Sequence, residues 1–179
     1  MATDTLRIGS EAPDFELKGT DEKVYSLDSF KNNEALIVIF SCNHCPYVRA
    51  YEDRIIAIQN DFKNKAAFVA INSNDADNYP EDSFEKMKER ADEKGFNFPY
   101  LRDEDQSVAK AYDATHTPEI FLFDKNRKLA FHGKIDDNWR EPEDVKQNYL
   151  REALGELLEG KQISVPETFT IGCTIKWKN

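Results

Sequence analysis

Two cysteines stand three positions apart in this chain of 179 residues: Cys42 and Cys45, with Asn43 and His44 between them. Only one further cysteine is present, Cys173. A secreted domain that depends on disulfides usually has more cysteines, in an even number. In a reducing compartment, cysteines at this spacing instead indicate redox chemistry or metal binding. They can also close a small disulfide ring over one helical turn.

The segments on either side of the pair predict where it lies in the fold. Residues 35–40 (ALIVIF) are a continuous apolar run rich in β-branched side chains, which is typical of a strand buried on both faces. After the pair, apolar residues return at helical spacing: Val48, Tyr51, Ile55, Ile58 and Phe62. Because unpaired amides and a partial positive charge at a helix N-terminus favour a thiolate, we expect the pKa of Cys42 to lie below the ~8.5 of a free thiol.

A second segment of interest, Thr115-His116-Thr117-Pro118, precedes the apolar run 119–124 (EIFLFD). Proline is tolerated at the first residue of a strand. Asn43 and His44, between the cysteines, and His116, two residues before the proline, are candidates for residues that tune the sulfurs. A protonated His44 would favour a neighbouring thiolate.

The rest of the first half alternates strands and helices. Asp82 followed by Glu85 resembles a capping box at the start of a helix, and Gly95 suits its end. The pattern predicts a hairpin from residues 15–17 and 24–27, a strand over 66–72, a helix over 83–94, an extended piece at 98–101 and a short helix at 105–112.

The second half is predicted to close the sheet with an antiparallel pair. Strands over 119–124 and 128–135 are joined by so short a turn that they must run antiparallel. Pro142 is placed to start a last helix, which Gly160 ends, and the tail 161–179 has little periodicity. The whole order predicts an α/β fold with a mixed central sheet flanked by helices.

The motif Cys42-x-x-Cys45 after ALIVIF, together with Thr117-Pro118 before EIFLFD, resembles the thioredoxin superfamily. Residues 12–15 (APDF), the segment 74–111 and the hairpin 124–133 narrow this resemblance to the AhpC/TSA, TlpA-like branch.

Two further motifs, residues 42–46 (CNHCP) with the adjoining Tyr47 and residues 172–177 (GCTIKW), resemble a group of peroxiredoxin-like thioredoxin-fold proteins. The resemblance covers nearly the whole chain. It implies one thioredoxin-like domain over residues 1–179, with an N-terminal hairpin extension at 1–30, a helical insert at 74–112 before the cis-proline strand and a C-terminal tail at 161–179.

The resemblance also implies a role for each residue of the site. Cys42 matches the nucleophilic, more exposed cysteine and Cys45 the resolving one. Thr117 matches the residue whose backbone pairs with an extended substrate, and Pro118 matches the cis-proline. The implied activity is that of a thiol–disulfide oxidoreductase, which acts on a protein or small-molecule disulfide with a thiol electron donor and needs no cofactor and no metal.

A thiol peroxidase is an alternative, in which a sulfenic acid on Cys42 is resolved by Cys45 or Cys173. Peroxiredoxins have a proline and a threonine seven and three residues before the reactive cysteine. For Cys42 these positions hold Ala35 and Ile39, which counts against efficient peroxide activation.

A zinc or copper(I) site is a second alternative, since Cys42 and Cys45 with His44 or His116 are soft ligands.

Thioredoxins also have a buried aspartate six residues before the first cysteine, where this chain has a leucine, so Cys45 needs another base. Cys173 is either a third thiol that folds back near Cys42 or an ordinary buried thiol of the tail.

Composition excludes several classes of partner. Lys and Arg number 24 and Asp and Glu number 34, which gives a net charge of −10. We therefore expect neither a nucleic-acid partner nor attraction to an anionic membrane.

No apolar run approaches the ~20 residues of a membrane span. Residues 1–13 lack the apolar core of a signal peptide, so we expect a cytoplasmic protein.

Overall fold

A seven-stranded mixed sheet forms the centre of the computed structural model, which describes residues 6–179. The strand order is β2-β1-β5-β4-β3-β7-β8. Strand β3 (Ala35–Ser41) pairs in parallel with β4 (Ala66–Asn72) and antiparallel with β7 (Glu119–Phe123), so it lies inside the sheet. The remaining strands are β1 (Leu17–Gly19), β2 (Val24–Tyr25), β5 (Tyr100–Arg102), β6 (His116–Thr117), β8 (Leu129–Gly133) and β9 (Cys173–Thr174).

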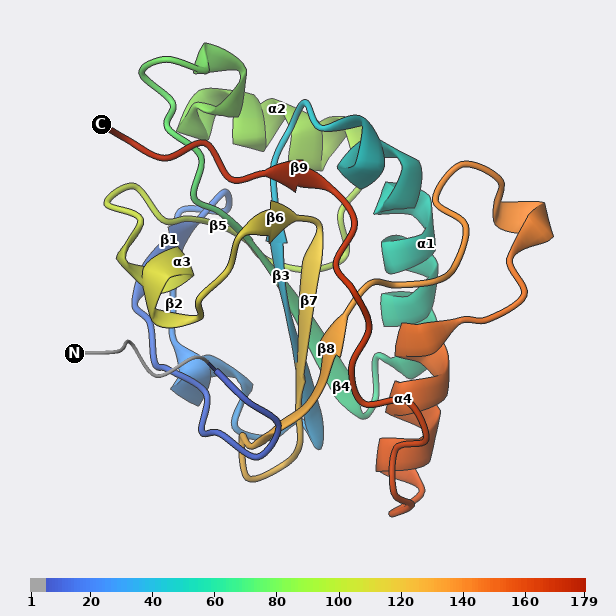
Figure 1. Cartoon of the computed structure of the whole chain (residues 1–179). Helices are drawn as coiled ribbons and strands as arrows, with labels where there is room; N and C mark the ends of the chain where they lie inside the picture. Colours follow the sequence, from blue (N-terminus) through green and yellow to red (C-terminus); the bar gives the residue numbers. More distant parts are fainter. Residues whose placement is uncertain (1–5) are drawn as a thin grey trace.

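Helices cover both faces of this sheet (Figure 1). The α-helices are α1 (Pro46–Phe62), α2 (Phe84–Lys94), α3 (Ser107–Ala111) and α4 (Tyr149–Leu158). Short 3-10 helices are η1 (Leu27–Phe30), η2 (Pro80–Asp82) and η3 (Pro142–Asp144). Among residues 6–179, no helix combines the length and the apolar character that crossing a bilayer requires.

Both faces of β3 are buried, because alternate residues of a strand point to opposite sides. Leu36, Val38 and Phe40 pack in the hydrophobic cluster that contains α3. Ile37 and Ile39 pack in the cluster on the other face, with α1 and α4. The continuous apolar run therefore marks a central strand, and the predicted mixed sheet between helices is confirmed.

The predicted start of α2 is wrong by one residue, and the difference matters for the site. The N-cap is Ser83, whose Oγ accepts a hydrogen bond from the amide of Lys86 at 3.2 Å. Asp82 is not the cap, because its carboxylate is turned into the protein, where the backbone amide of Asn43 donates to it at 2.7 Å. Gly95 ends the helix in the left-handed region, as predicted.

The last helix also begins later than predicted. Pro142 starts only the 3-10 turn η3, and α4 begins at Tyr149. Lys146 and Gln147, between these helices, are hydrogen-bonded to Asp137. The Asp137 amide donates to the carbonyl of Gln147 at 3.2 Å, and the Asp137 carboxylate accepts from the Lys146 amide at 3.0 Å.

Candidate active site

The two cysteines lie where β3 ends and α1 begins. Residues Cys42 to Cys45 form the connection, and Cys45 is the N-cap of α1. Pro46 occupies the first helical position, where its missing amide leaves no helical hydrogen bond unmade. All three cysteines of the chain are present as thiols. This position at the carboxyl end of a central strand is typical of ligand sites in α/β sheets.

Thr117 lies against both sulfurs. The Sγ of Cys42 is 3.5 Å from the hydroxyl oxygen of Thr117, and the Sγ of Cys45 is 3.4 Å from its carbonyl oxygen. The peptide bond between Thr117 and Pro118 is cis. The fold thus brings together the two segments that stood out in the sequence, although about 75 positions separate them.

Neither sulfur of the pair is open to solvent. Cys42 is 2% exposed and Cys45 is fully buried. The expectation that Cys42 is the more exposed cysteine holds only by this small margin. An external disulfide can therefore reach Cys42 only if a neighbouring segment moves.

The pKa values of the pair differ from the sequence-based expectation for Cys42. Its hydrogen bond to Cys45, its burial and the charge of Asp82 raise the pKa of Cys42 above the ordinary thiol value. The same hydrogen bond lowers the pKa of Cys45, and Cys173 and the amide of Val48 lower it further. The helix N-terminus acts on Cys45, because this residue and not Cys42 is the N-cap.

The two thiols consequently ionise as a unit. The first proton leaves easily, because the remaining S–H stabilises the thiolate beside it. The second proton is retained, because a second charge would be buried beside the first. At neutral pH we therefore expect the pair to hold one negative charge and one proton between two sulfurs.

Asp82 is a residue of the site that the sequence-based analysis assigned to a helix cap. It is fully buried, and its carboxylate accepts hydrogen bonds from the Asn43 amide at 2.7 Å, the Asn72 side chain at 3.2 Å and the Asn74 side chain at 2.9 Å. These donors compensate its burial. No sequence signal marked this role, because the donors come from three separate positions: the turn after β3, the last residue of β4 and the loop after β4.

Asn43, through its backbone amide, and His44, through its ring, both contact Asp82. The Oδ1 of Asn43 accepts a hydrogen bond from the hydroxyl of Tyr100 at 2.7 Å. The Nδ1 of His44 lies 2.7 Å from the Asp82 carboxylate, and the imidazole stacks parallel to the ring of Tyr79 at 6.1 Å. Asn43 therefore anchors the turn, while His44 lies beside both the Asp82 carboxylate and the Cys42 sulfur.

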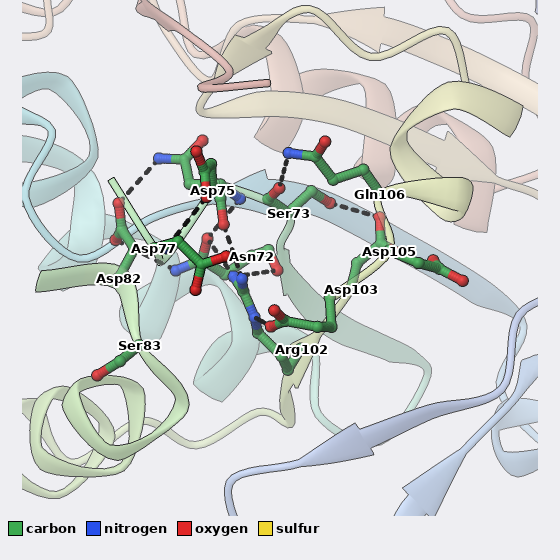
Figure 2. A network of polar contacts seen from close by, with 12 residues as sticks. Asn72, Ser73, Asp75, Asp77, Asp82, Ser83, Arg102, Asp103, Asp105 and Gln106 are labelled. Carbon is green, nitrogen blue, oxygen red and sulfur yellow. Dashed lines mark hydrogen bonds and ion pairs between the residues drawn. The ribbon is translucent and has the colours of Figure 1, made fainter. Parts of the chain in front are cut away.

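Asp82 belongs to a larger polar network at the carboxyl ends of β4 and β5 (Figure 2). Ser73 donates a hydrogen bond to the carboxylate of Asp103 at 2.6 Å. Arg102 donates to the carbonyl of Asn74 at 2.7 Å, and Gln106 donates to the carbonyl of Ser73 at 2.7 Å. The network ties the loop after β4 to the loop after β5, and so fixes the segment that carries Asp82.

Glu119, directly after the cis-proline, holds the other side of the site. Its buried carboxylate accepts hydrogen bonds from the amides of Thr115 and His116 at 2.9 and 3.0 Å, and it lies 2.7 Å from the Nε2 of His132. Burial raises the pKa of Glu119. His132 and the two amides lower this pKa by more than burial raises it, so the pKa of Glu119 lies below its ordinary value.

His116 lies apart from the sulfurs. Its Nδ1 is 2.7 Å from the hydroxyl oxygen of Thr115. Its neighbour in β6, Thr117, presents its hydroxyl to Cys42, and successive side chains of a strand point to opposite faces. The structure therefore does not bring the His116 ring to the pair. His132, which had no predicted role, supports Glu119 instead.

The C-terminal segment covers the site. Strand β9 pairs antiparallel with β6, with Cys173 opposite Thr117 and Thr174 opposite His116 (Figure 1). Cys173 is half-buried and packs with Cys42, Cys45 and Val48. The tail had no predicted element, because two residues are too few to show a strand pattern.

Three side chains are arranged so that they could hold a metal ion. The Sγ of Cys42, the Nδ1 of His44 and a carboxylate oxygen of Asp82 all lie within 4.8 Å of one another. Thiolate, imidazole and carboxylate are the ligand types that zinc takes. The set differs from the one considered from the sequence, because Asp82 replaces Cys45 and His116.

Comparison with known proteins agrees with this fold. A thiol-disulfide oxidoreductase ResA from Geobacillus thermodenitrificans is 28% identical over 145 residues, 80% of this chain and 76% of ResA. The structure of an uncharacterized conserved protein from Geobacillus kaustophilus is 42% identical and covers 98% of this chain and 94% of its own, with a TM-score of 0.91.

A more distant structure identifies the fold. The thioredoxin domain of a thiol-disulfide oxidoreductase from Bacteroides vulgatus, 20% identical, covers 72% of this chain and 89% of its own with a TM-score of 0.62. The fold is thus thioredoxin-like, as expected. The model of the AhpC/TSA family matches residues 8–132, and the chain therefore belongs to the AhpC/TSA family.

Proposed function

We propose that this protein is a thiol–disulfide oxidoreductase that works through Cys42 and Cys45, with a protein or small-molecule disulfide as substrate and a thiol as electron donor. The observation that carries this proposal is the contact of both sulfurs with one residue, Thr117, through two different groups. The name of the ResA relative supports the same class of reaction.

Thr117 favours the protonation state that the reaction needs. Attack requires a thiolate on Cys42, which forms when its proton passes to Cys45. In that state the Thr117 hydroxyl donates to the Cys42 thiolate, and the Thr117 carbonyl accepts the S–H of Cys45. Cys45 is thus the base for Cys42 in this first step.

The first half of the reaction then forms a mixed disulfide. The Cys42 thiolate attacks one sulfur of the substrate disulfide, a bond forms between them, and the other substrate sulfur leaves as a thiolate. Cys45 next attacks the Cys42 sulfur and releases the second substrate thiolate. The S–H proton of Cys45 passes to this leaving thiolate, and the other takes a proton from solvent. The substrate is reduced by two electrons, and the Cys42–Cys45 disulfide is formed.

Reduction of insulin by dithiothreitol tests the proposal directly. Wild-type protein is expected to accelerate the reaction, and Cys42→Ser to abolish the acceleration. Cys45→Ser is expected to stop at a mixed disulfide between Cys42 and the substrate, because the resolving sulfur is missing. The trapped adduct is read by mass spectrometry under denaturing, non-reducing conditions.

Ser41→Ala is the matched control, since it changes a single oxygen atom one position before Cys42 and leaves the cysteines in place. Circular dichroism checks that each variant folds. Undiminished insulin reduction by a folded Cys42→Ser variant would show that the proposal is wrong.

A further inference from the structure

The C-terminal segment occupies the backbone edge of β6 beside the cysteines. Cys173 stands opposite Thr117, the residue that contacts both sulfurs of the pair. Gly172 allows this close approach, because a Cβ atom there would lie 2.2 Å from the carbonyl oxygen of Thr117. Only a residue without a side chain fits at this position.

Several hydrogen bonds hold the segment in place. The Ile175 amide donates to the carbonyl of Thr115 at 2.9 Å, and the side chain of Ile175 is buried in the core. The Lys176 amide donates to the Oδ1 of Asn74 at 2.9 Å, while its carbonyl accepts from the amide of Asp75 and the side chain of Gln106. Gln106 and Asp75 belong to the network of Figure 2, so the position of Cys173 is built into the fold.

The three sulfurs differ in their access to solvent. Cys42 is 2% exposed and Cys45 is fully buried, whereas Cys173 is half-buried. Cys173 also packs against the cluster formed by Cys42, Cys45 and Val48. A thiol from solvent therefore meets Cys173 before it meets either sulfur of the pair.

We propose that Cys173 is a third redox cysteine, which exchanges with Cys45 and passes the disulfide from the buried pair to the protein surface. This inference rests on the proposed function, because the Cys42–Cys45 disulfide is its starting point. It adds a route by which the thiol electron donor regenerates the enzyme without reaching the buried sulfurs.

Each step is a thiol–disulfide exchange. The Cys173 thiol attacks the Cys45 sulfur, the Cys45–Cys173 bond forms as the Cys42–Cys45 bond breaks, and the leaving Cys42 thiolate takes up the proton that Cys173 loses. A donor thiolate then attacks Cys173, and Cys45 leaves as a thiolate. A second donor thiol attacks the donor sulfur of this mixed disulfide, the donor disulfide forms, and Cys173 leaves as a thiolate that takes up the proton of the second donor, so all three cysteines are reduced.

The second step is favoured by the properties of Cys45. Thiolates of low pKa are the faster leaving groups in disulfide exchange. The pKa of Cys45 is lowered by its hydrogen bonds to neighbouring thiols and to the α1 N-terminus. Attack at the exposed sulfur, Cys173, therefore expels the sulfur that best carries a negative charge.

The variant Cys42→Ser, which keeps only Cys45 and Cys173, tests this proposal. Oxidised with diamide, an azo compound that joins two thiols, it is expected to form an intramolecular Cys45–Cys173 disulfide. Cys45→Ser, which keeps Cys42 and Cys173, is the matched control. It is expected to close its disulfide at least about tenfold more slowly, because burial and the charge of Asp82 still raise the pKa of Cys42, and each pKa unit is a factor of ten in ionisation. Peptide mapping by mass spectrometry identifies the bond.

Gly172→Ala in the Cys42→Ser background gives a second test. The added methyl group would displace β9 from Thr117, so closure of Cys45–Cys173 is expected to slow by at least about tenfold. Gly155→Ala, where a Cβ meets no atom within 4 Å, is the control and is expected to leave the rate unchanged. Equal rates for the two glycine variants would contradict the proposal.

These experiments separate the inference from the proposed function. If folded Cys42→Ser keeps two free thiols or forms only dimers while wild type still forms Cys42–Cys45 and reduces insulin, the role of Cys173 is wrong and the proposed function stands. If wild type forms no Cys42–Cys45 disulfide, the proposed function itself fails.

Discussion

The carboxylate of Asp82 accepts a hydrogen bond from the backbone amide of Asn43 at 2.7 Å, across 39 positions of the chain. This bond joins the turn between the cysteines to the loop before α2. The same carboxylate lies 2.7 Å from the Nδ1 of His44 and close to Cys42. Asp82 therefore both positions the turn and places a negative charge beside the first sulfur.

Replacement of Asp82 by alanine is expected to destabilise the fold by at least about 3 kcal/mol. Several buried amide donors lose their acceptor, and each unsatisfied donor costs about 1–3 kcal/mol. Urea denaturation at pH 7 measures the change. Asp82→Asn, which keeps one acceptor oxygen and removes the charge, is expected to lie between alanine and wild type. A loss below 1 kcal/mol for alanine would show that the network does not depend on this carboxylate.

Reduced protein is expected to contain a single thiolate at neutral pH, shared by Cys42 and Cys45. Absorbance at 240 nm reports this charge, and it should persist well below the ordinary thiol pKa of ~8.5 because the pKa of Cys45 is lowered. Cys42→Ser and Cys45→Ser should both shift the titration upward, since each loses the neighbouring S–H. An ordinary thiol titration in wild type would contradict the shared proton.

The shifted pKa values of Cys42 and Cys45 make the free energy of unfolding of the reduced protein depend on pH. The lowered pKa of Cys45 contributes stability that is fully present above the unfolded thiol value of ~8.5 and is lost as the pH falls through the folded value. The raised pKa of Cys42 has the opposite effect at high pH. Above pH ~8.5 the unfolded chain loses this proton and the folded chain keeps it, so the free energy of unfolding falls as the pH rises. Relative to the Cys42→Ser, Cys45→Ser double variant, reduced protein should therefore gain stability as the pH rises toward ~8.5 and lose it above that value. Urea titrations across the pH range give the comparison.

Thr117→Val is expected to slow the reaction of Cys42 while it keeps the backbone carbonyl for Cys45. A hydrogen bond to a charged group contributes about 1.5–3 kcal/mol, and 1.36 kcal/mol is a factor of ten in rate, so alkylation of Cys42 should slow by about tenfold or more. Iodoacetamide labelling read by peptide mass spectrometry measures the rate. Thr117→Ser retains the hydroxyl and should restore most of it, whereas equal rates for valine and serine would exclude a role for the hydroxyl.

Glu119→Gln is expected to weaken the loop before the cis-proline by about 1–3 kcal/mol at pH 7, because a charge-assisted partner of His132 is lost. The pKa of Glu119 is lowered in the folded protein, so its stabilising effect is present above the unfolded value of ~4.3 and disappears as the pH falls through the folded value. The difference between variant and wild type in urea denaturation should therefore shrink in acid. A difference that is constant with pH would contradict this assignment.

Hydrogen peroxide is expected to react with Cys42 no faster than with a free thiol of the same ionisation. Positions seven and three residues before Cys42 hold Ala35 and Ile39, both within β3 and buried, where they offer no polar group to a peroxide. Stopped-flow measurement on reduced protein gives the rate. A rate far above that of a free thiol would make a thiol peroxidase the better assignment.

Local sequence patterns were sufficient for much of the fold. The run of residues 35–40 marked β3 because a strand buried on both faces needs apolar side chains at every position, and the helical spacing after it marked α1. Gly95 marked the end of α2 through its freedom to adopt a left-handed backbone conformation. These signals depend only on neighbours in the chain, as does the placement of Cys42 and Cys45 at the end of a strand.

Other features depended on contacts between distant segments. Asp82 has the sequence context of a helix cap, but buried amide donors from the loops after β3 and β4 draw its carboxylate inward. The lowered pKa belongs to Cys45 because the folded chain surrounds it with Cys42, Cys173 and the first turn of α1. The two residues of β9 become a strand only by pairing with β6, so the approach of Cys173 to the pair was decided by the tertiary structure alone.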